Sequence, residues 1–414
     1  MRRIALPVLA LLLFCLPAAA QWQGEFVDGP DGRRVVNPET PAAGESTLGA
    51  RELWRVGDDE EDVLIGVVSE LLHDADGNVY LLDGQLSEIQ VLDPDGQWLN
   101  TIGREGEGPG EFRNASDMFW IPGGQIGVLQ TWPGKIVTLR PDGTPGDAMA
   151  LPFDKGGSMQ IGSLGHGIDG GIVMAGAGWT REDGGMFQLS YLKAVDAAGN
   201  DLAVFHEDKR EQSFGNWEFR EERWVDFQRR WTAAPDGRVA AALSFDDYRI
   251  HVWNRDGSLA HVIERPGAAP VERTGEEKQA FQAAFDAMTR WNPGSTFRIR
   301  DTHQAVGRLF YRQDGSLWVQ SAAAQWRSPE GRFTSFDVYD RDGRFVRRVH
   351  LDLDGDAAQD GVFFDGDRMY VVTDLMSAFM ASMGVGGDAG MEPEPVNVIA
   401  YRVDPVSMEL TRTP

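Results

Sequence analysis

Short hydrophobic stretches separated by Asp-Gly turns recur along this chain. In the first unit, Asn78–Leu82 follows the turn Asp76-Gly77, and Glu88–Leu92 precedes the turn Asp95-Gly96, so the two turn glycines lie 19 residues apart. Glycine reaches positive φ without a Cβ clash and aspartate tolerates the left-handed region, which suits tight two-residue hairpins. The pattern therefore predicts antiparallel sheet throughout.

The same pair of turns marks six units. The first turn recurs at Gly123-Gly124, Asp169-Gly170, Asp236-Gly237, Asp314-Gly315 and, with a register ambiguity of one residue, Asp365-Gly366-Asp367. The second turn recurs at Asp142-Gly143, Ala198-Gly199, Asp256-Gly257, Asp342-Gly343 and, at the last unit, Asp404-Pro405. A repeat of about 45 residues built from four short strands is typical of a β-propeller. We predict an all-β fold, a six-bladed propeller with four-stranded antiparallel blades.

The hydrophobic runs define the strands of the first two blades. We expect Val63–His73, Asn78–Leu82, Glu88–Leu92 and Gln97–Ile102 in blade one, and Ala115–Ile121, Gln125–Leu129, Lys135–Leu139 and Pro145–Leu151 in blade two. Closure of the ring has two solutions. Either Arg51–Val56 or Met408–Arg412 forms the outer strand of the last blade.

The N-terminal region has the features of an export signal. A basic start at Arg2 and Arg3, an apolar run and the small residues Ala18–Ala20 predict a signal peptide over residues 1–20. The run is shorter than the roughly 20 residues of a membrane span, so we expect an exported protein, periplasmic or extracellular. Residues 21–47 lack periodicity and predict a disordered spacer, and residues 48–414 form the propeller.

Charge and cysteine content narrow the functional classes. The chain has 39 basic and 64 acidic residues and a net charge of −25, which disfavours nucleic acid as a partner. The single cysteine, Cys15, lies within the predicted signal peptide, so we expect no disulfides and no thiol chemistry. We expect a monomer without a membrane span.

One segment carries a family resemblance. The link between blades one and two, Gly103–Phe112 with the sequence GREGEGPGEF, resembles that of the six-bladed propellers of the NHL and TolB-like group, notably exported bacterial members. The helical insertion between blades four and five is also similar. The resemblance implies the fold but no single activity, because related propellers include lactonases, lyases and binding scaffolds.

Extra residues fall at one end of the blades. The turn glycines are 29 residues apart in blade three and 28 in blade five, and the crossings from Gly199 to Gly237 and from Gly257 to Gly315 take 38 and 58 residues. These insertions follow strand two or strand four, which end on the same face. That face should carry the binding-face candidates Trp132, Trp179, Trp217, Trp224, Trp291 and Trp326, which either bind a ligand or pack the loops onto the ring.

The longest insertion, residues 266–302, predicts a helix. Thr274 and Glu277 form a capping box, and an apolar stripe from Phe281 to Trp291 follows at three- and four-residue spacing. Such a complete stripe favours a docked brace over a movable lid.

Ionisable residues recur on the inner strands, seven residues before the first turn. This position carries the channel-mouth candidates Glu70, Asp117, Ser163, Arg230, Arg308 and Asp360. Inner strands surround the central channel of a propeller, so these side chains should meet at its mouth. Two interpretations follow: the arginines pair with the carboxylates and close the channel, or Glu70, Asp117 and Asp360 hold Ca²⁺ as in gluconolactonase-like propellers.

No motif identifies a catalytic residue. The sequence has no His-Glu-x-x-His and no Gly-x-Ser-x-Gly, Gly103–Phe112 lacks the lysine of a phosphate-binding loop, and Asp352–Asp356 does not match an EF-hand. We therefore predict a propeller that binds a small molecule or a protein on its loop-rich face. The alternative is a calcium-dependent hydrolase or lactonase.

Overall fold

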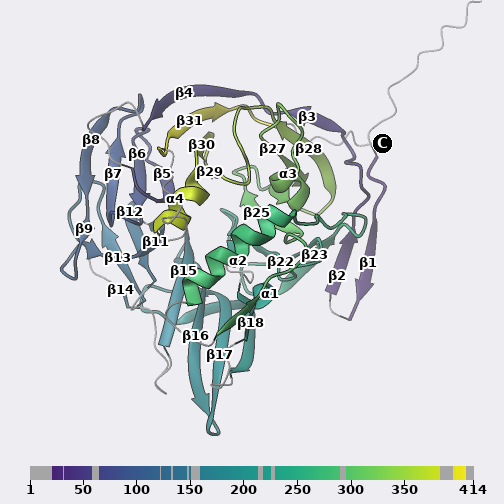
Figure 1. The fold of residues 1–414 in the computed structure, drawn as a ribbon, viewed down its shortest axis with the longest axis horizontal. Helices are drawn as coiled ribbons and strands as arrows, with labels where there is room; N and C mark the ends of the chain where they lie inside the picture. The colour runs from purple at the N-terminus through teal and green to yellow at the C-terminus, as the bar shows by residue number, and fades with distance from the viewer. Residues whose placement is uncertain are drawn as a thin grey trace, which may run out of the picture.

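The computed structural model of the 414-residue chain describes residues 21–30, 32–57, 65–121, 123–131, 134–146, 149–150, 159–212, 218–224, 229–289, 295–382 and 395–406. Within them the strands form a ring of six blades around a central channel (Figure 1), as the repeat predicts. In each blade the first strand faces the channel and the fourth lies at the rim.

The first three blades use strands that are consecutive in sequence. Blade one contains β5 (Val68–His73), β6 (Val79–Asp83), β7 (Glu88–Leu92) and β8 (Trp98–Ile102). Blade two contains β11 (Ala115–Ile121), β12 (Gln125–Gln130), β13 (Lys135–Leu139) and β14 (Met149–Ala150), and it is linked to blade one through the short strands β9 (Arg104–Glu105) and β10 (Glu111–Phe112). Blade three contains β15 (Met159–Ile168), β16 (Gly171–Glu182), β17 (Gly185–Val195) and β18 (Asp201–Gln212).

The other three blades recruit strands from the N-terminal region. Blade four contains β20 (Trp231–Ala233), β21 (Val239–Ala241), β22 (Arg249–Trp253) and β23 (Leu259–Glu264), extended by β2 (Gly32–Val36) and β1 (Glu25–Gly29). Blade five contains β25 (Val306–Tyr311), β26 (Leu317–Ser321), β27 (Thr334–Tyr339) and β28 (Phe345–Leu351), extended by β3 (Glu45–Thr47). Blade six contains β29 (Gly361–Asp365), β30 (Arg368–Val372), β31 (Val398–Val403) and β4 (Ala50–Val56).

Strand β4 closes the ring. It pairs antiparallel with β31, with Val56 opposite Val398, so the N-terminal of the two candidate strands is the one that completes blade six. The other candidate, Met408–Arg412, lies outside the described residues. Closure by an N-terminal strand joins the two ends of the propeller through backbone hydrogen bonds.

The expectation of a disordered spacer over residues 21–47 is wrong. Strand β2 pairs in parallel with β23, and β3 pairs in parallel with β28. Val35 is fully buried, and the Asn37 side chain accepts a hydrogen bond from Phe345 N at 2.7 Å and donates one to Gly343 O at 3.0 Å. The segment lacks periodicity because its strands are single additions to existing sheet edges, which supply the hydrogen-bonding partners.

A hydrophobic cluster lies at each junction between neighbouring blades. At the junction of blades six and one, for example, Leu71 and Leu81 pack with Tyr370 and Val398. Between blades one and two, Leu82 and Ile126 belong to another such cluster. The core is therefore a ring of blade-to-blade contacts, which leaves the channel wall available to polar residues.

The Asp-Gly turns are longer than predicted in most blades. His73 pairs with Val79, so five residues connect β5 and β6, and only Gly77 has positive φ there, at 89°. The carboxylate of Asp74 accepts hydrogen bonds from the N–H groups of Asp76 and Asn78 at 3.0 and 2.9 Å. The side chain of Asp74 thus caps the turn, and only the glycine adopts the left-handed backbone conformation. Two-residue turns do occur between β15 and β16 and between β29 and β30.

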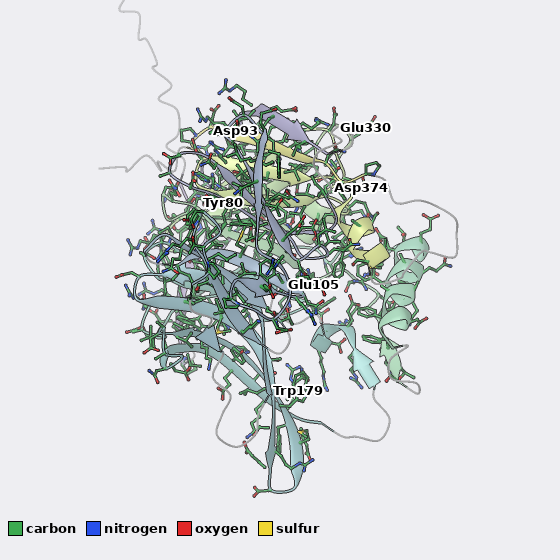
Figure 2. All side chains as sticks on the ribbon, turned by 90° about the vertical axis from the view of Figure 1, so that its left-hand side faces the viewer. Tyr80, Asp93, Glu105, Trp179, Glu330 and Asp374 are labelled. Carbon is green, nitrogen blue, oxygen red and sulfur yellow. The ribbon has the colours of Figure 1, made fainter. Side chains whose placement is uncertain are left out.

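The helices follow the second or fourth strands of their blades. They are α1 (Glu221–Trp224), α2 (Gly275–Thr289), α3 (Ala322–Trp326) and α4 (Leu375–Ser382). Figures 1 and 2 show α2 and α4 on the same side of the disc, which we call the helix-bearing face. Asp93, in the second turn of blade one, lies on the opposite side from Glu330 and Asp374, and we call that side the turn face (Figure 2).

Blade three departs from the predicted arrangement. Its additional residues continue the strand pairing, with Trp179 opposite Gln188 and Gln188 opposite Arg210. The result is an arm of three long strands that projects beyond the rim, with Trp179 labelled on it in Figure 2. The insertion therefore lengthens a hairpin instead of adding a loop over the channel.

Candidate functional site

In blades one, two and five, a β-bulge precedes an ionisable side chain at the channel mouth. The pairing of the first two strands slips between Val68 and Glu70 in blade one, and in the same way before Asp117 in blade two and before Arg308 in blade five. A bulge inserts one unpaired residue and re-aims the side chain that follows it. Glu70, Asp117 and Arg308 therefore occupy equivalent positions, as the sequence spacing predicts.

Glu70 and Asp117 form a hydrogen-bonded carboxyl pair across blades one and two. Asp117 is buried and accepts hydrogen bonds from Met118 N at 2.8 Å and Gly165 N at 2.5 Å, and Glu70 accepts one from Leu71 N at 2.9 Å. Burial raises the pKa of Asp117 to about 7. Burial, followed by the negative charge of Asp117, raises the pKa of Glu70 well above its usual value. Two adjacent carboxyls avoid double ionisation by sharing a proton.

The backbone contacts of the pair favour the proton on Glu70 over Asp117. Asp117 accepts two backbone N–H groups, which stabilise its ionised form, and its hydrogen bond with Glu70 also lowers its pKa. Glu70 accepts one such bond and is half-buried beside the channel. The pair consequently carries one negative charge and one acidic proton at neutral pH.

Two arginines face the carboxyl pair. Arg308 donates from Nη1 to Val362 O at 2.8 Å, and its guanidinium lies 5.8 Å from the ring centre of Phe363. Burial lowers the pKa of Arg308, the charge of Arg229 lowers it further, and Glu70 counteracts both. The surrounding protein partly desolvates the Arg229 guanidinium and so lowers its pKa although the residue is exposed, whereas the charge of Asp117 raises it. Both guanidinium groups thus lie within electrostatic range of the pair and of each other.

The residue of blade four at this site is Arg229 rather than the predicted Arg230. Arg230 is 1% exposed and donates from Nη1 to Ser244 O at 2.6 Å, which directs its guanidinium to the loop after β21. Arg229 and Arg230 lie in the turn before β20 rather than in a strand, so the alignment of the inner strands does not fix which of the two faces the channel. Arg229 is exposed and makes no hydrogen bond or ion pair with another described residue.

The backbone register at Ser163 and the contacts of Asp360 differ from the prediction. In blade three the pairing slips between Gly162 and Leu164, so Ser163 is the bulged residue and Leu164 is the equivalent of Glu70. Asp360 accepts hydrogen bonds from Asp356 N and Asp374 N, both at 2.9 Å, and so connects two loops of blade six. The alignment of Asp360 with the other inner strands was ambiguous because the first turn of blade six, Gly366-Asp367, has two residues, whereas five residues connect the same strands in blade one.

The proposed calcium ligands are therefore not brought together. Of Glu70, Asp117 and Asp360, only the first two are in contact. Among the residues that the structure describes, no three His, Cys, Asp or Glu side chains are grouped as metal ligands.

A second polar layer lies nearer the turn face and was not foreseen from sequence. The carboxylate of Asp365 is 2.7 Å from Nδ1 of His73, and it also accepts a hydrogen bond from His73 N at 2.7 Å. The pKa of the nearby His166 is lowered by burial, which the charge of Asp365 partly offsets. These residues end inner strands, so an alignment of the strand ends in addition to the bulge positions could have found them.

On the helix-bearing face, a buried ion-pair network holds α2 in place. Arg273 makes two hydrogen bonds to Glu221, at 2.7 and 2.6 Å, and a weaker one to His303 at 3.4 Å. Nε2 of His303 is 3.1 Å from Glu277, which also accepts hydrogen bonds from Arg327 at 2.7 and 2.9 Å. The network connects α1, α2 and the end of α3.

Helix α2 itself forms as the sequence indicates. Thr274 N donates to Glu277 at 2.7 Å and Glu277 N donates to the Thr274 hydroxyl at 3.1 Å, which is the predicted capping box. Phe285 is buried and stacks on Phe297 at 4.2 Å between ring centres. These contacts favour the brace over the lid.

Of the six tryptophans considered for binding, the structure places two side chains. Trp326 stacks on His303 at 3.9 Å and so packs α3 onto the network, while Trp179 lies half-buried on the projecting arm. Trp224 belongs to α1. The remaining three, Trp132, Trp217 and Trp291, lie outside the described residues.

A groove of about 410 Å³ runs beside Trp326 on the helix-bearing face. Its walls come from the loop after α3, including Glu330 and Arg332, and from the loop after β28, including Asp354 and Asp356. A second hollow of about 290 Å³ lies between blades four and five on the turn face, next to Asp236 and Arg341. Of these two depressions, only the groove beside Trp326 adjoins inserted helices.

Comparison with known proteins agrees with this architecture. Residues 59–155 match the model of the DUF5128 family, a 6-bladed beta-propeller, in agreement with the predicted six-bladed fold. No protein of curated function matches the sequence significantly. None of the described helices has the length and apolar character needed to cross a membrane.

Several solved structures are similar at low sequence identity. A Bacteroides fragilis protein described as exported is 16% identical, with 89% of this chain and 98% of that chain covered and a TM-score of 0.48. A DUF4221 family member from Bacteroides vulgatus is 9% identical, with 87% and 99% covered and a TM-score of 0.46. A luciferin-regenerating enzyme is 12% identical, with 87% and 97% covered and a TM-score of 0.42. Similarities this distant carry no information on ligand or activity.

Proposed function

We propose that this protein is an exported binding propeller that recognises a ligand on its helix-bearing face, around the channel mouth. One observation carries the proposal: two arginines stand beside the Glu70–Asp117 pair at the mouth, while a buried ion pair holds α2 on the same face. Binding sites commonly combine a rigid scaffold with a few convergent polar groups. The groove beside Trp326 extends the same face.

The charges at the mouth favour a binder over a calcium-dependent hydrolase. Such a hydrolase needs several carboxylate or carbonyl oxygens around one cation. Here the two carboxyls that meet are hydrogen-bonded to each other, and the guanidinium groups beside them repel a divalent ion. A thermal-shift experiment with Ca²⁺, Zn²⁺ and a chelator is expected to leave the melting temperature unchanged, because only an ion that prefers the folded state stabilises it.

Binding is tested by a thermal-shift screen of the mature protein against neutral saccharides, amino acids, mono- and dicarboxylates and short peptides. We expect at least one class to raise the melting temperature in a saturable manner. A ligand of the helix-bearing face should be weakened by Glu330→Ala or Arg229→Gln, and unaffected by Arg341→Gln on the turn face, where the Arg341 side chain is 75% exposed. No response to any class, together with stabilisation by Ca²⁺, would favour the hydrolase.

A further inference from the structure

One histidine on the helix-bearing face is buried between two ion pairs. The side chain of His303 is 1% exposed, and its Nε2 lies 3.1 Å from Glu277, which accepts two hydrogen bonds from Arg327. On the other side of the ring, Nδ1 faces Nε of Arg273 at 3.4 Å, and Arg273 is paired with Glu221. Two arginines balance two glutamates, so this cluster is neutral as long as His303 is uncharged.

The partners of His303 assign its proton to one ring nitrogen. Nε of Arg273 can only donate, so Nδ1 of His303 is the acceptor and Nε2 carries the hydrogen that Glu277 accepts. A second proton would have to bind at Nδ1. It would replace the acceptor by a donor that faces the Arg273 donor, and it would place a positive charge beside that guanidinium.

The surroundings of the ring oppose this second proton. Burial lowers the pKa of His303, the hydrogen bond to Glu277 offsets part of that effect, and the charges of Arg273 and Arg327 add to it. The carboxylate of Glu277 stays ionised, because its hydrogen bonds with Arg327 lower its pKa to about 2. Trp326 covers one face of the imidazole at 3.9 Å between ring centres. A charged His303 is therefore better accommodated in water than in this contact.

The other groups around His303 are aromatic, paired with each other or exposed. The ring of Phe281 approaches the imidazole edge-on at 6.0 Å. Asp301, two residues before His303, is paired with Lys278 of α2 at 2.6 Å. Glu272, on the neighbouring segment, is exposed and gives only its backbone oxygen to the cluster, through a bond from Arg327. His303 is thus the group of this cluster whose charge changes near neutral pH.

We propose that protonation of His303 releases the first turn of α2, so that this helix is a brace at neutral pH and a movable lid in acid. Glu277 lies in that turn and joins it to His303 and Arg327, whereas the stacked rings of Phe285 and Phe297 hold the rest of the helix without charge. The inference rests on the proposed binding function, because α2 lies on the face that would bind the ligand, and it names how pH regulates that face.

The direction of the pH dependence follows from where His303 binds its proton. The released form exposes the imidazole and gives it the ordinary pKa of about 6.5, whereas the closed form lowers that pKa. The closed form therefore keeps its full stability above about pH 6.5 and loses it as the pH falls further, because the released form binds more protons.

A distance between two spin labels tests the movement without a ligand. The labels are attached to Glu276→Cys, in the first turn of α2, and to Asn100→Cys, on the rim of blade one, both at exposed positions. The one native cysteine, Cys15, lies in the predicted signal peptide. Lowering the pH from 8 to 5 should add a second, reversible population of distances. A pair on Asn100→Cys and Arg341→Cys, both on the ring, is the control and should not change.

His303→Gln is the decisive variant because its side chain cannot take up a proton. It should remove the response, leaving the same distance between the labels at pH 8 and at pH 5. A second readout is the ¹⁵N NMR spectrum of histidine-labelled wild-type protein, in which the variant identifies the signal of His303. That signal should show an unprotonated Nδ1 at pH 8 and should titrate over the range in which the distance changes.

The contrary results are distinct. An unchanged distance at pH 5, or an equal response by a folded His303→Gln protein, would overturn the release of α2. If the variant does not fold, the wild-type spectrum decides, and a distance change that does not follow the titration of His303 would overturn it as well. Movement of α2 in a protein that binds no compound of the wider screen would refute the binding function alone. A ligand bound by a protein whose α2 stays fixed would refute the release alone.

Discussion

Arg273 and Glu221 form an ion pair with two hydrogen bonds in which each side chain is only 2% exposed. Glu221 also accepts a hydrogen bond from Arg300 N at 2.7 Å, so its carboxylate joins α1 to the segments on both sides of α2. A buried pair is costly to form, and removing one partner is costlier because it leaves an uncompensated charge. The helix-bearing face therefore depends on this pair for its shape.

Glu221→Gln should strongly destabilise the protein. The substitution keeps the size of the side chain but leaves the Arg273 charge buried and unpaired, which costs about 3–5 kcal/mol of unfolding free energy. Urea unfolding followed by tryptophan fluorescence measures the loss. Glu276→Gln, at an exposed position of α2, is the control and should change stability by less than about 0.5 kcal/mol. Equal effects of the two substitutions would contradict a structural role for the pair.

Asn37→Ala should loosen the N-terminal strands from the ring. The substitution removes the acceptor for Phe345 N at 2.7 Å and for Trp22 Nε1 at 2.8 Å in a buried environment. Unsatisfied buried donors cost about 1–3 kcal/mol, and limited proteolysis should cut residues 21–47 faster than in the wild type. Asn100→Ala, on the exposed strand β8, is the matched control. Unchanged proteolysis of Asn37→Ala would mean that the segment is held by other contacts.

Gly96→Ala should destabilise the protein more than Gly123→Ala, although both glycines have positive φ, at 87° and 102°. The strained backbone costs about 1–2 kcal/mol in either case. At Gly96 a Cβ would also lie 2.7 Å from the Trp54 ring, which belongs to the strand that closes blade six, whereas at Gly123 it would meet open space. Thermal unfolding of the two variants isolates the contact with Trp54. Similar melting temperatures would exclude this contact as a constraint on ring closure.

The carboxyl pair predicts a stability difference that depends on pH. The folded-state pKa of Asp117 is raised to about 7 from an ordinary value of 3.8, so the folded protein retains protons that the unfolded chain releases. This contribution to stability is fully present below about pH 4 and is lost as the pH rises through 7. Glu70→Gln removes the shared titration, so its stability relative to the wild type should increase between pH 5 and pH 8. A constant difference across that range would show that the carboxyls do not share a proton.

Export makes a separate prediction. Cleavage after Ala20 would produce a mature protein that begins at Gln21, the first residue that the structure describes. Intact-mass spectrometry of the protein recovered from the periplasm or medium checks the cleavage site. A mass that includes Met1, or a lipid attached to Cys15, would contradict it.

The order of the blades, their number and the helix-bearing face could be predicted from sequence because each depends on local features. A turn glycine, a capping box such as Thr274 with Glu277, and the length of an insertion are all encoded within a few neighbouring residues. Glu70, Asp117 and Arg308 were found for the same reason, since one bulge repeats at one spacing. Their convergence followed from the ring symmetry.

Tertiary structure alone decided which partners those residues meet. Residues 21–47 look unstructured in isolation because their strands are completed by sheet edges more than 200 positions away, as in the pairing of Arg34 with Val262. The choice of Arg229 over Arg230 depends on the path of the turn before β20, and Asp360 accepts a hydrogen bond from Asp374 N in a loop instead of facing the channel mouth. Periodicity predicts that a residue lies on a strand. The register of that strand and backbone donors from distant segments determine which groups its charged side chain contacts.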